Sequence, residues 1–177
     1  IAPEDPRRMI IGDDGGAQVS YDAGETWSTY HNQPTAQFYR VTTDDEFPYR
    51  IYVAQQDNST LRIRHRTEGA TIDEDDWEST AGGESGHIAI DPTDNDIVYG
   101  GSYHGFLTRV NHKRKTVRSV NIWPDDNMGH GAEDARYRFQ WNFPLFFSPH
   151  DPKKLYAASN HLHVSTDEGQ SWQTISP

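Results

Sequence analysis

The chain has 177 residues, which is long enough for one domain with a sizeable core. Hydrophobic residues make up 33% of it and aromatic residues 12%, a mixture typical of short, half-buried strands rather than of disorder. The formal net charge of −11 argues against binding to nucleic acid or to an anionic membrane. No apolar run approaches the ~20 residues that span a bilayer. The absence of cysteine excludes disulfides and thiolate–metal sites.

Apolar residues alternate with a period of two almost throughout the chain, which predicts strands and no amphipathic helix. The first group of predicted strands covers residues 9–13, 17–22 and 26–30. The opening residues Ile1, Ala2 and Pro3 align with only the end of a further strand, because the later sequence Ile88-Ala89-Ile90 also runs into an Asp-Pro turn. We therefore expect the first group to lack its first strand.

The rest of the chain contains three further groups of four predicted strands, each about 40–45 residues long, the size of a propeller blade. In chain order the predicted strands cover residues 37–43, 49–55, 60–66 and 77–80; 86–90, 97–102, 106–111 and 116–122; and 143–148, 155–159, 161–166 and 172–175. The sequence thus predicts an all-β chain of four-stranded antiparallel meander blades. The expected blades of this partial β-propeller over residues 1–177 are 1–31, 35–80, 84–123 and 142–177, with a long loop at 124–142.

About four blades lie at the lower end of the range for closed propellers, which have about four to eight. We expect a segment of a larger propeller, in which remaining blades or a protein partner complete the sheet. The alternative is a tight four-bladed ring.

One short motif occurs twice, at residues 20–27 and 165–172, and fits Ser-x-Asp-x-Gly-x-(Thr/Ser)-Trp. Its Asp side chain can accept hydrogen bonds from the backbone of its own turn. Its Gly can supply a positive φ, and its Trp can pack against a neighbouring sheet. We predict a structural role for Ser20, Asp22, Gly24, Thr26 and Trp27, and for Ser165, Asp167, Gly169, Ser171 and Trp172.

This motif resembles the Asp box, or BNR repeat, of sialidase-like and sortilin-like β-propellers. Further stretches resemble large secreted bacterial BNR-repeat proteins that are often labelled glycosyl hydrolase: GDDGG at 12–16, PTAQFY at 34–39, FPYRIYVAQQDN at 47–58, GGESG at 82–86, MGHGAED at 128–134 and YRFQW at 137–141. The resemblance implies a secreted or periplasmic bacterial protein and a structural box. The hydrolase label rests on fold analogy, which is weak evidence for chemistry.

A meander blade places alternate connections at opposite ends of its strands. The Asp-Pro turns and the two motif copies therefore share one end, which we call the turn face. The loops between the second and third strands, and those between blades, form the other end, the loop face. The candidate binding residues lie on the loop face and are Asp13, Asp14, Gln56, Asp57, Asn58, Glu84, Tyr103, His104, His130 and Arg138.

Glycoside hydrolysis needs two carboxylates at a defined separation. The weak catalytic candidates are Asp57, Glu84, Glu133 and Asp134, and the sequence does not show that any two of them meet. In the long loop, an ion pair of Arg138 with Glu133 or Asp134 is expected to hold the loop. The set of arginines is too small for a sialidase.

Metal sites and cofactors are not predicted. The run Asp13-Asp14-Gly15-Gly16 lacks the spacing of an EF-hand and predicts a tight hairpin. His161 and His163 share one side of a strand without a third ligand, so they are interpreted as surface or packing residues.

The leading functional hypothesis is a non-catalytic propeller segment that acts as a protein-interaction or ligand-binding scaffold. The alternative is part of a BNR-repeat glycoside hydrolase that acts on extracellular polysaccharide, so enzymatic activity stays open. The expected partners are the remaining blades or another protein, with a glycan as a further possibility.

Overall fold

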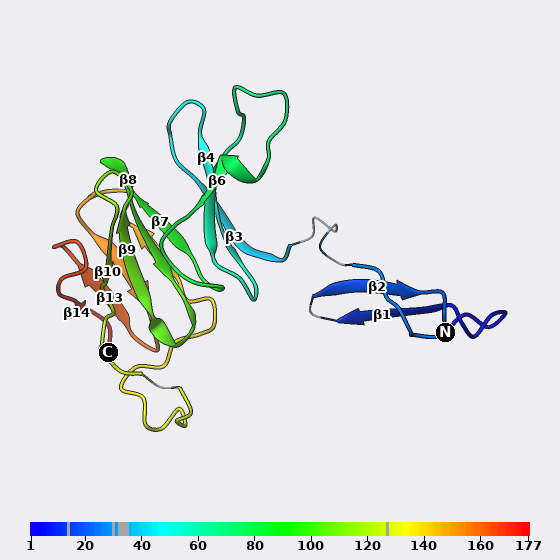
Figure 1. Cartoon of the computed structure of the whole chain (residues 1–177). Coiled ribbons are helices and arrows are strands. Elements are labelled where there is room, and N and C mark those ends of the chain that lie inside the picture. Colours follow the sequence, from blue (N-terminus) through cyan, green and yellow to red (C-terminus); the bar gives the residue numbers. More distant parts are fainter. Residues whose placement is uncertain (14, 30, 32–35, 127) are drawn as a thin grey trace. The chain divides into compact units, whose positions relative to one another are not determined.

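The structure is a computed structural model that describes residues 1–13, 15–29, 31, 36–126 and 128–177. The chain divides into two compact units, Ile1–Ala36 and Gln37–Pro177. Figure 1 shows that both units are built from strands. Within the described ranges, none of the helices has the length and apolar character needed to traverse a bilayer.

The first unit contains one antiparallel hairpin of β1 (Met9–Asp13) and β2 (Gly16–Ser20). The Asp13 carboxylate accepts a hydrogen bond from the backbone N–H of Gly15 at 2.8 Å, which stabilises the tight turn that the sequence predicts. Ahead of β1 the described residues form only an isolated bridge between Ala2 and Asp5.

The third strand predicted for this unit is not formed over the described residues 26–29. The backbone N–H of Ser28 does donate to the Val19 carbonyl at 3.0 Å. The return bond, however, comes from the Val19 N–H to the Ser28 hydroxyl, also at 3.0 Å. A side chain thus replaces a backbone acceptor, and the ladder stops after one backbone bond.

The second unit holds three four-stranded antiparallel sheets whose strands follow one another in chain order. The second blade consists of β3 (Phe38–Thr43), β4 (Arg50–Gln55), β5 (Thr60–Arg64) and β6 (Trp77–Ser79). The third consists of β7 (Ile88–Asp91), β8 (Asp94–Gly101), β9 (Leu107–Asn111) and β10 (Thr116–Ser119). The fourth consists of β11 (Leu145–Phe147), β12 (Leu155–Ala158), β13 (Leu162–Ser165) and β14 (Gln173–Thr174). Single 3₁₀ turns occur at Glu74–Asp76 and Tyr103–Gly105.

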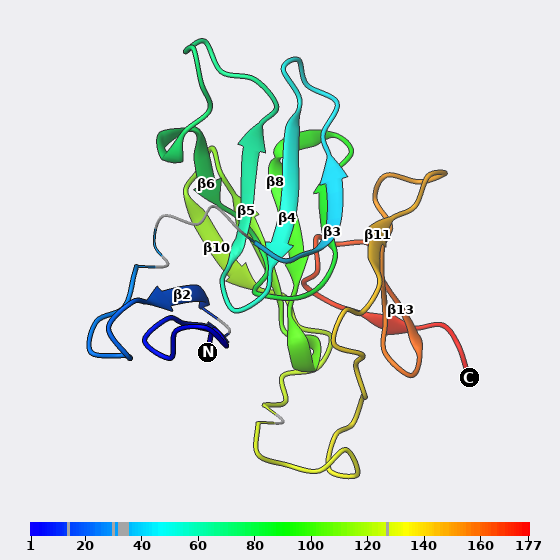
Figure 2. The same ribbon diagram turned by 90° about the vertical axis from the view of Figure 1, so that its right-hand side faces the viewer.

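The first strands of the three sheets gather together, since β7 contacts both β3 and β11. Figure 2 shows the second blade broadside, with β3, β4, β5 and β6 in order from one edge to the other. The predicted all-β class and the four-stranded meanders are therefore confirmed for this unit.

Two predicted outer strands are shorter than expected, because side chains replace backbone partners at their ends. Beyond β10, the Val120 N–H still donates to the Leu107 carbonyl at 2.9 Å, but the Leu107 N–H donates to the Asn121 side chain at 2.8 Å. Beyond β14, the Leu162 N–H donates in the same way to the Ser176 hydroxyl at 2.8 Å. The ladders predicted to reach residues 122 and 175 therefore end early.

The core lies between the sheets. Tyr99, Leu107, Phe143 and Leu155 belong to one buried cluster, which joins the third and fourth blades. Tyr52, Ala81, Ile88 and Val98 form a second cluster, which joins the second and third blades. Truncation of a side chain such as Leu107 is expected to cost about 2–5 kcal/mol of folding free energy.

Candidate functional site

Three loops of the second and third blades border a groove of about 400 Å³ on the loop face. They are the β4–β5 loop, the connection between β6 and β7, and the β8–β9 loop. The residues that line the groove are Asp57, Asn58, Gly83, Glu84, Ser102 and Tyr103. Four of these, Asp57, Asn58, Glu84 and Tyr103, are residues that the sequence nominated.

Hydrogen bonds fix the acidic wall of this groove. The side-chain amide nitrogen of Gln56 donates to the Asp57 Oδ1 at 2.7 Å and to the Glu84 Oε2 at 3.0 Å. The backbone N–H of Asp57 donates to the same Glu84 oxygen at 3.0 Å. Asp57 itself adopts a left-handed φ of 56° in this turn. The two carboxylates therefore lie on one wall and share one amide donor.

An aromatic wall adjoins the acidic one. The ring of Tyr103 stacks on Trp141, with centroids 5.2 Å apart and an interplanar angle of 16°. The Trp141 Nε1–H donates to the Tyr39 hydroxyl at 2.9 Å, and this hydroxyl is hydrogen-bonded to the Gln56 Oε1. A continuous chain of contacts thus links the aromatic pair to Glu84.

Trp141 and Tyr39 were missed as site residues by the sequence analysis. Trp141 is the penultimate residue of the long loop 124–142, and its side chain remains 41% exposed. One feature of the sequence could have indicated Trp141 as a site residue, because it is an aromatic residue in a long loop of mixed charge. Its hydrogen-bond partner Tyr39 lies 102 positions away, and no sequence pattern joins the two.

Three further residues that the sequence nominated are His104, Asp13 and Asp14. His104, with a left-handed φ of 59°, contacts the Tyr103 ring edge-on at 5.5 Å. Asp13 belongs to the first unit, and Asp14 lies outside the described residues. Among the described residues of the second unit, His104 is not part of the groove lining.

Over the described residues of the long loop, Arg138 does not form the predicted ion pair with Glu133 or Asp134. Asp134 lies 3.8 Å from the His130 ring nitrogen, with both side chains 62% exposed. Arg138 is held through its backbone instead: its N–H donates to Asn160 Oδ1 at 2.8 Å, and the Asn160 N–H donates to its carbonyl at 2.9 Å. These paired backbone bonds, rather than an ion pair with Glu133 or Asp134, anchor the loop.

The two motif turns have nearly the same internal hydrogen bonds. In the first, the Asp22 Oδ1 accepts from Ser20 Oγ at 2.8 Å and from the Thr26 N–H at 2.9 Å. In the second, the Asp167 Oδ1 accepts from Ser165 Oγ at 2.8 Å and from the Ser171 N–H at 2.9 Å.

These bonds lower the pKa of both aspartates. Hydrogen bonds from the Thr26 side chain and backbone, helped by Ser20, lower the pKa of Asp22 to about 2. Hydrogen bonds from Ser171 likewise lower the pKa of Asp167. Both carboxylates are thus committed to their own turns, as acceptors in the ionised form.

The tryptophans of the two turns differ in their partners. Trp172 Nε1 donates to the Val120 carbonyl of the third blade at 3.0 Å, and so joins two blades. Trp27 Nε1 donates to the Gly24 carbonyl of its own turn at 3.1 Å.

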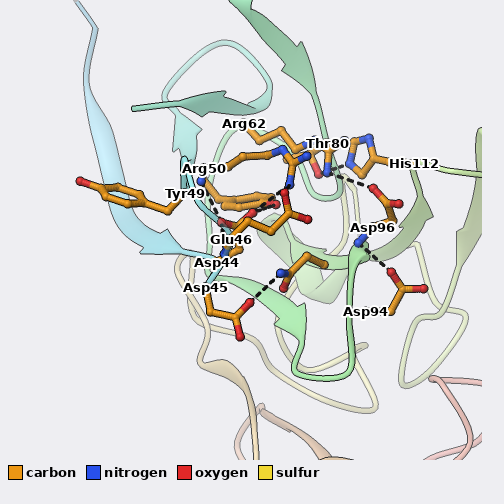
Figure 3. Close-up of polar contacts among 12 residues, drawn as sticks. Asp44, Asp45, Glu46, Tyr49, Arg50, Arg62, Thr80, Asp94, Asp96 and His112 are labelled. Carbon is orange, nitrogen blue, oxygen red and sulfur yellow. Dashed lines mark hydrogen bonds and ion pairs between the residues drawn. The ribbon is translucent and has the colours of Figure 1, made fainter. Parts of the chain in front are cut away.

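A polar network on the turn face joins the second blade to the third (Figure 3). The Asp44 carboxylate accepts from the Arg50 N–H at 2.8 Å and from the Tyr52 hydroxyl at 3.0 Å. Asn95 of β8 donates to Asp45 at 2.6 Å, which ties the two blades directly. Burial raises the pKa of Tyr52 to about 12, so this tyrosine stays protonated and is no nucleophile.

The same network contains a buried arginine, Arg62 of β5, and a histidine with a buried side chain, His112 directly after β9 (Figure 3). Arg62 pairs with Glu78 at 2.7 Å. His112 Nε2 is 2.9 Å from the Thr80 hydroxyl, and burial together with the Arg62 charge lowers the pKa of His112. These contacts make the network a joint between blades.

His163 is a packing residue, as the sequence predicted. Its ring is fully buried, with Nε2 2.8 Å from the Ser159 hydroxyl and Nδ1 3.1 Å from the Thr174 hydroxyl. Tyr137 packs edge-on against it at 4.7 Å. Throughout the described part of the chain, no group of three or more His, Asp or Glu side chains is placed to hold a metal ion.

No protein-family model matches the chain, and no curated protein matches it. Among solved structures it is similar to the GH74 xyloglucanase from Xanthomonas campestris, with 19% identity, a TM-score of 0.50 and coverage of 99% of this chain. The chain is built of β-propeller blades. The GH74 enzyme from Niastella koreensis (14% identity, TM-score 0.49, 97% coverage) and YCF48 from Cyanidioschyzon merolae (16%, 0.45, 100%) also match.

The blades span only part of these proteins. They cover 29% of the Xanthomonas xyloglucanase, 29% of the Niastella enzyme and 54% of YCF48. At such low identity, the likeness to the xyloglucanase shows only that these blades share its fold.

Proposed function

We propose that these blades form a non-catalytic scaffold, which presents the groove between the second and third blades to a ligand or a partner protein. In this proposal the two motif turns are Asp boxes of the BNR type, and further blades or another subunit complete the propeller. The scaffold acts outside the cytoplasm, in the periplasm or in the medium of a bacterium. The internal hydrogen bonds of Asp22 and Asp167 support the structural role of the boxes.

The proposal of a non-catalytic scaffold rests on the position of the Gln56 side-chain amide. Its nitrogen bonds the nearest oxygens of Asp57 and Glu84 at 2.7 Å and 3.0 Å, so it occupies the space between them. A glycosidase must place the scissile bond between its two carboxyl groups. In the described geometry that space holds a protein amide, and both carboxylates serve to join two loops.

The groove suits a neutral, hydroxyl-rich ligand such as a glycan. Tyr103, stacked on Trp141, supplies aromatic surface, and the carboxylate oxygens of Asp57 and Glu84 supply acceptors. Binding sites commonly combine apolar surface with a few polar groups that fix orientation. The two carboxylates disfavour an anionic ligand.

One observation favours the alternative, part of a glycoside hydrolase. Asp57 and Glu84 line the same groove, and their shared donor limits the separation of their nearest oxygens to roughly the 5–5.5 Å of retaining enzymes. Hydrolysis would require the Gln56 side chain to leave this position and admit the substrate.

Binding and turnover by the whole chain distinguish the two functions. A panel of soluble oligosaccharides, xyloglucan fragments included, is titrated by calorimetry and also incubated for release of new reducing ends. The scaffold predicts saturable binding without turnover, weakened by Trp141→Ala. Glu133→Gln, in the exposed part of the long loop, serves as the control and should bind like the wild type.

The hydrolase predicts turnover that Asp57→Asn or Glu84→Gln abolishes while binding persists. Such turnover would refute the scaffold. If no glycan binds, the ligand class assigned to the groove is wrong, and a protein partner of the scaffold remains to be sought by the same variants.

A further inference from the structure

Positive charge is concentrated in one stretch of this acidic chain. Between residues 97 and 124 there is no Asp or Glu, but there are five cationic residues, Arg109, Lys113, Arg114, Lys115 and Arg118. The rest of the chain carries all 27 acidic residues against the other 11 basic ones. All five cations lie on β9, on β10 or in the turn between these two strands of the third blade. This hairpin is therefore a basic island on an acidic surface.

The hairpin also contains an exposed sheet edge. The order β10-β9-β8-β7 places β10 outermost, and all four of its residues are exposed. The Val120 N–H donates inward to Leu107, so alternation along the strand turns the Val117 and Ser119 N–H groups outward. Val117 is an apolar side chain that is 68% exposed. An unpaired edge of this kind can accept another strand.

The cations surround a hollow beside this edge. A cavity of about 480 Å³ is lined in part by Arg109, Lys113, Arg114 and Arg118. Within it, Arg109 pairs with Glu168 at 2.6 Å, and Arg118 lies 3.8 Å from the same carboxylate. The lining thus holds four cations against two acids, Asp94 and Glu168. This excess of positive charge would attract an additional carboxylate.

The outer strands of the other two blades differ. On β6, Glu78 is paired with Arg62, and the strand carries no basic residue. On β14 there are only two residues, both uncharged. A long, basic edge thus occurs on the third blade alone among the described sheets.

We propose that β10 is a docking strand for an extended acidic segment of a partner protein, which adds to the sheet as a fifth strand. The outward N–H and C=O groups of Val117 and Ser119 would pair with the backbone of the segment. Its acidic side chains would face Arg118 and the lysines of the turn, and an apolar side chain would lie beside Val117.

A short acidic peptide fits this surface better than nucleic acid or an anionic membrane does. The basic island is one hairpin long, and the surrounding surface is acidic, so an extended polyanion would meet repulsion on either side. The site lies at the β9–β10 end of the third blade, whereas the groove lies at the β8–β9 end. The inference therefore goes beyond the proposed function and does not depend on the ligand of the groove.

The test measures fluorescence anisotropy of a labelled peptide, Asp-Val-Asp-Val-Asp, added to the whole chain. The control peptide, Asn-Val-Asn-Val-Asn, has the same shape without charge. We expect the acidic peptide to bind, the control to bind far more weakly, and added salt to weaken the acidic complex. The variant Lys113→Glu/Lys115→Glu should weaken binding by roughly tenfold, whereas the exposed Lys153→Glu on the fourth blade should not.

A second variant separates strand addition from charge attraction. Val117→Pro removes one outward N–H and leaves the inward bonds of β10 in place, because proline is tolerated where the N–H faces solvent on an edge strand. Strand addition predicts weaker binding by Val117→Pro, with thermal unfolding as the check that the variant is folded. Unchanged binding by the folded variant, no binding by the wild type, or equally tight binding of a single-stranded oligonucleotide of equal charge would each overturn the proposal.

Discussion

The packing of the second motif turn against the third blade makes a quantitative prediction. Gly169 has φ of 78°, and a Cβ built on it would lie 2.8 Å from the Val120 Cβ. An alanine there must adopt a left-handed backbone, which costs about 1–2 kcal/mol. It must also displace Val120, and overpacking of this kind costs about 1–3 kcal/mol. We expect Gly169→Ala to lower the free energy of unfolding by about 2–5 kcal/mol.

A double-mutant cycle isolates the contact between the blades. Val120→Ala alone removes two buried methyl groups and should cost about 1.5–2.5 kcal/mol. It also removes the two Cγ atoms, each 3.2 Å from the new methyl of Gly169→Ala, while the Val120 Cβ at 2.8 Å remains. The clash is relieved in part, so the double variant should be more stable than the sum of the single effects predicts, by about 1 kcal/mol.

Urea unfolding followed by circular dichroism measures the four free energies, and equal m-values are required for the comparison. Gly24 provides a matched control, because its added Cβ would have no neighbour nearer than 3.5 Å. Gly24→Ala should carry the backbone cost alone, read from hydrogen exchange of β1 and β2. Additive effects of Gly169→Ala and Val120→Ala, within about 0.5 kcal/mol, would show that the blades do not meet as described.

Three further predictions concern the same joints. Trp172→Phe removes the hydrogen bond to the Val120 carbonyl and should lower the free energy of unfolding in urea by about 0.5–1.5 kcal/mol. An unchanged urea midpoint would contradict this prediction. The pKa of Asp22 is lowered to about 2 in the folded protein, so ionised Asp22 stabilises the fold above the unfolded pKa near 4, and this effect is lost as the pH falls toward 2. NMR titration of the Asp22 carboxyl should give the low pKa. A measured pKa near 4 would refute the prediction. Burial lowers the pKa of His163 in the folded protein, so the stability should fall as the pH drops below about 6.5, where the unfolded chain takes up the proton. Melting temperatures measured against pH should depend less steeply on pH in His163→Gln. An identical pH dependence would exclude His163 as its source.

Strand positions were predictable from alternation, whereas strand ends were not. The period-two pattern locates β9 to within a residue at its start, because buried and half-buried side chains alternate along Leu107–Asn111. The end of β10 depends on whether the Leu107 N–H meets a backbone carbonyl or the Asn121 side chain. Both choices keep the apolar pattern, so periodicity does not distinguish them. Ser28 ends the first unit's ladder for the same reason.

The candidate site was predictable only in part, because local motifs mark loops but not the distant residues that meet them. Asp57 and Glu84 were nominated from the meander rule, which places their loops on one face. The rule does not reveal that Gln56 links them or that Trp141 reaches Tyr39. The Trp141 contact depends on the path of the long loop, whose sequence lacks the alternation from which strands are predicted.

The side-chain bonds that end the outer strands also make the contact between blades possible. Because Asn121 accepts the Leu107 N–H, the carbonyl of Val120 has no ladder partner and is left to accept the Trp172 Nε1–H. Ser176 ends the fourth blade in the same way, through the Leu162 N–H, and Ile175 there occupies the position of Val120. Ile175 is 46% exposed, whereas Val120 is 4% exposed under the motif turn. Trp172 is thus one half of a joint between the third and fourth blades. The other half is a carbonyl that is left without a partner where the neighbouring ladder ends.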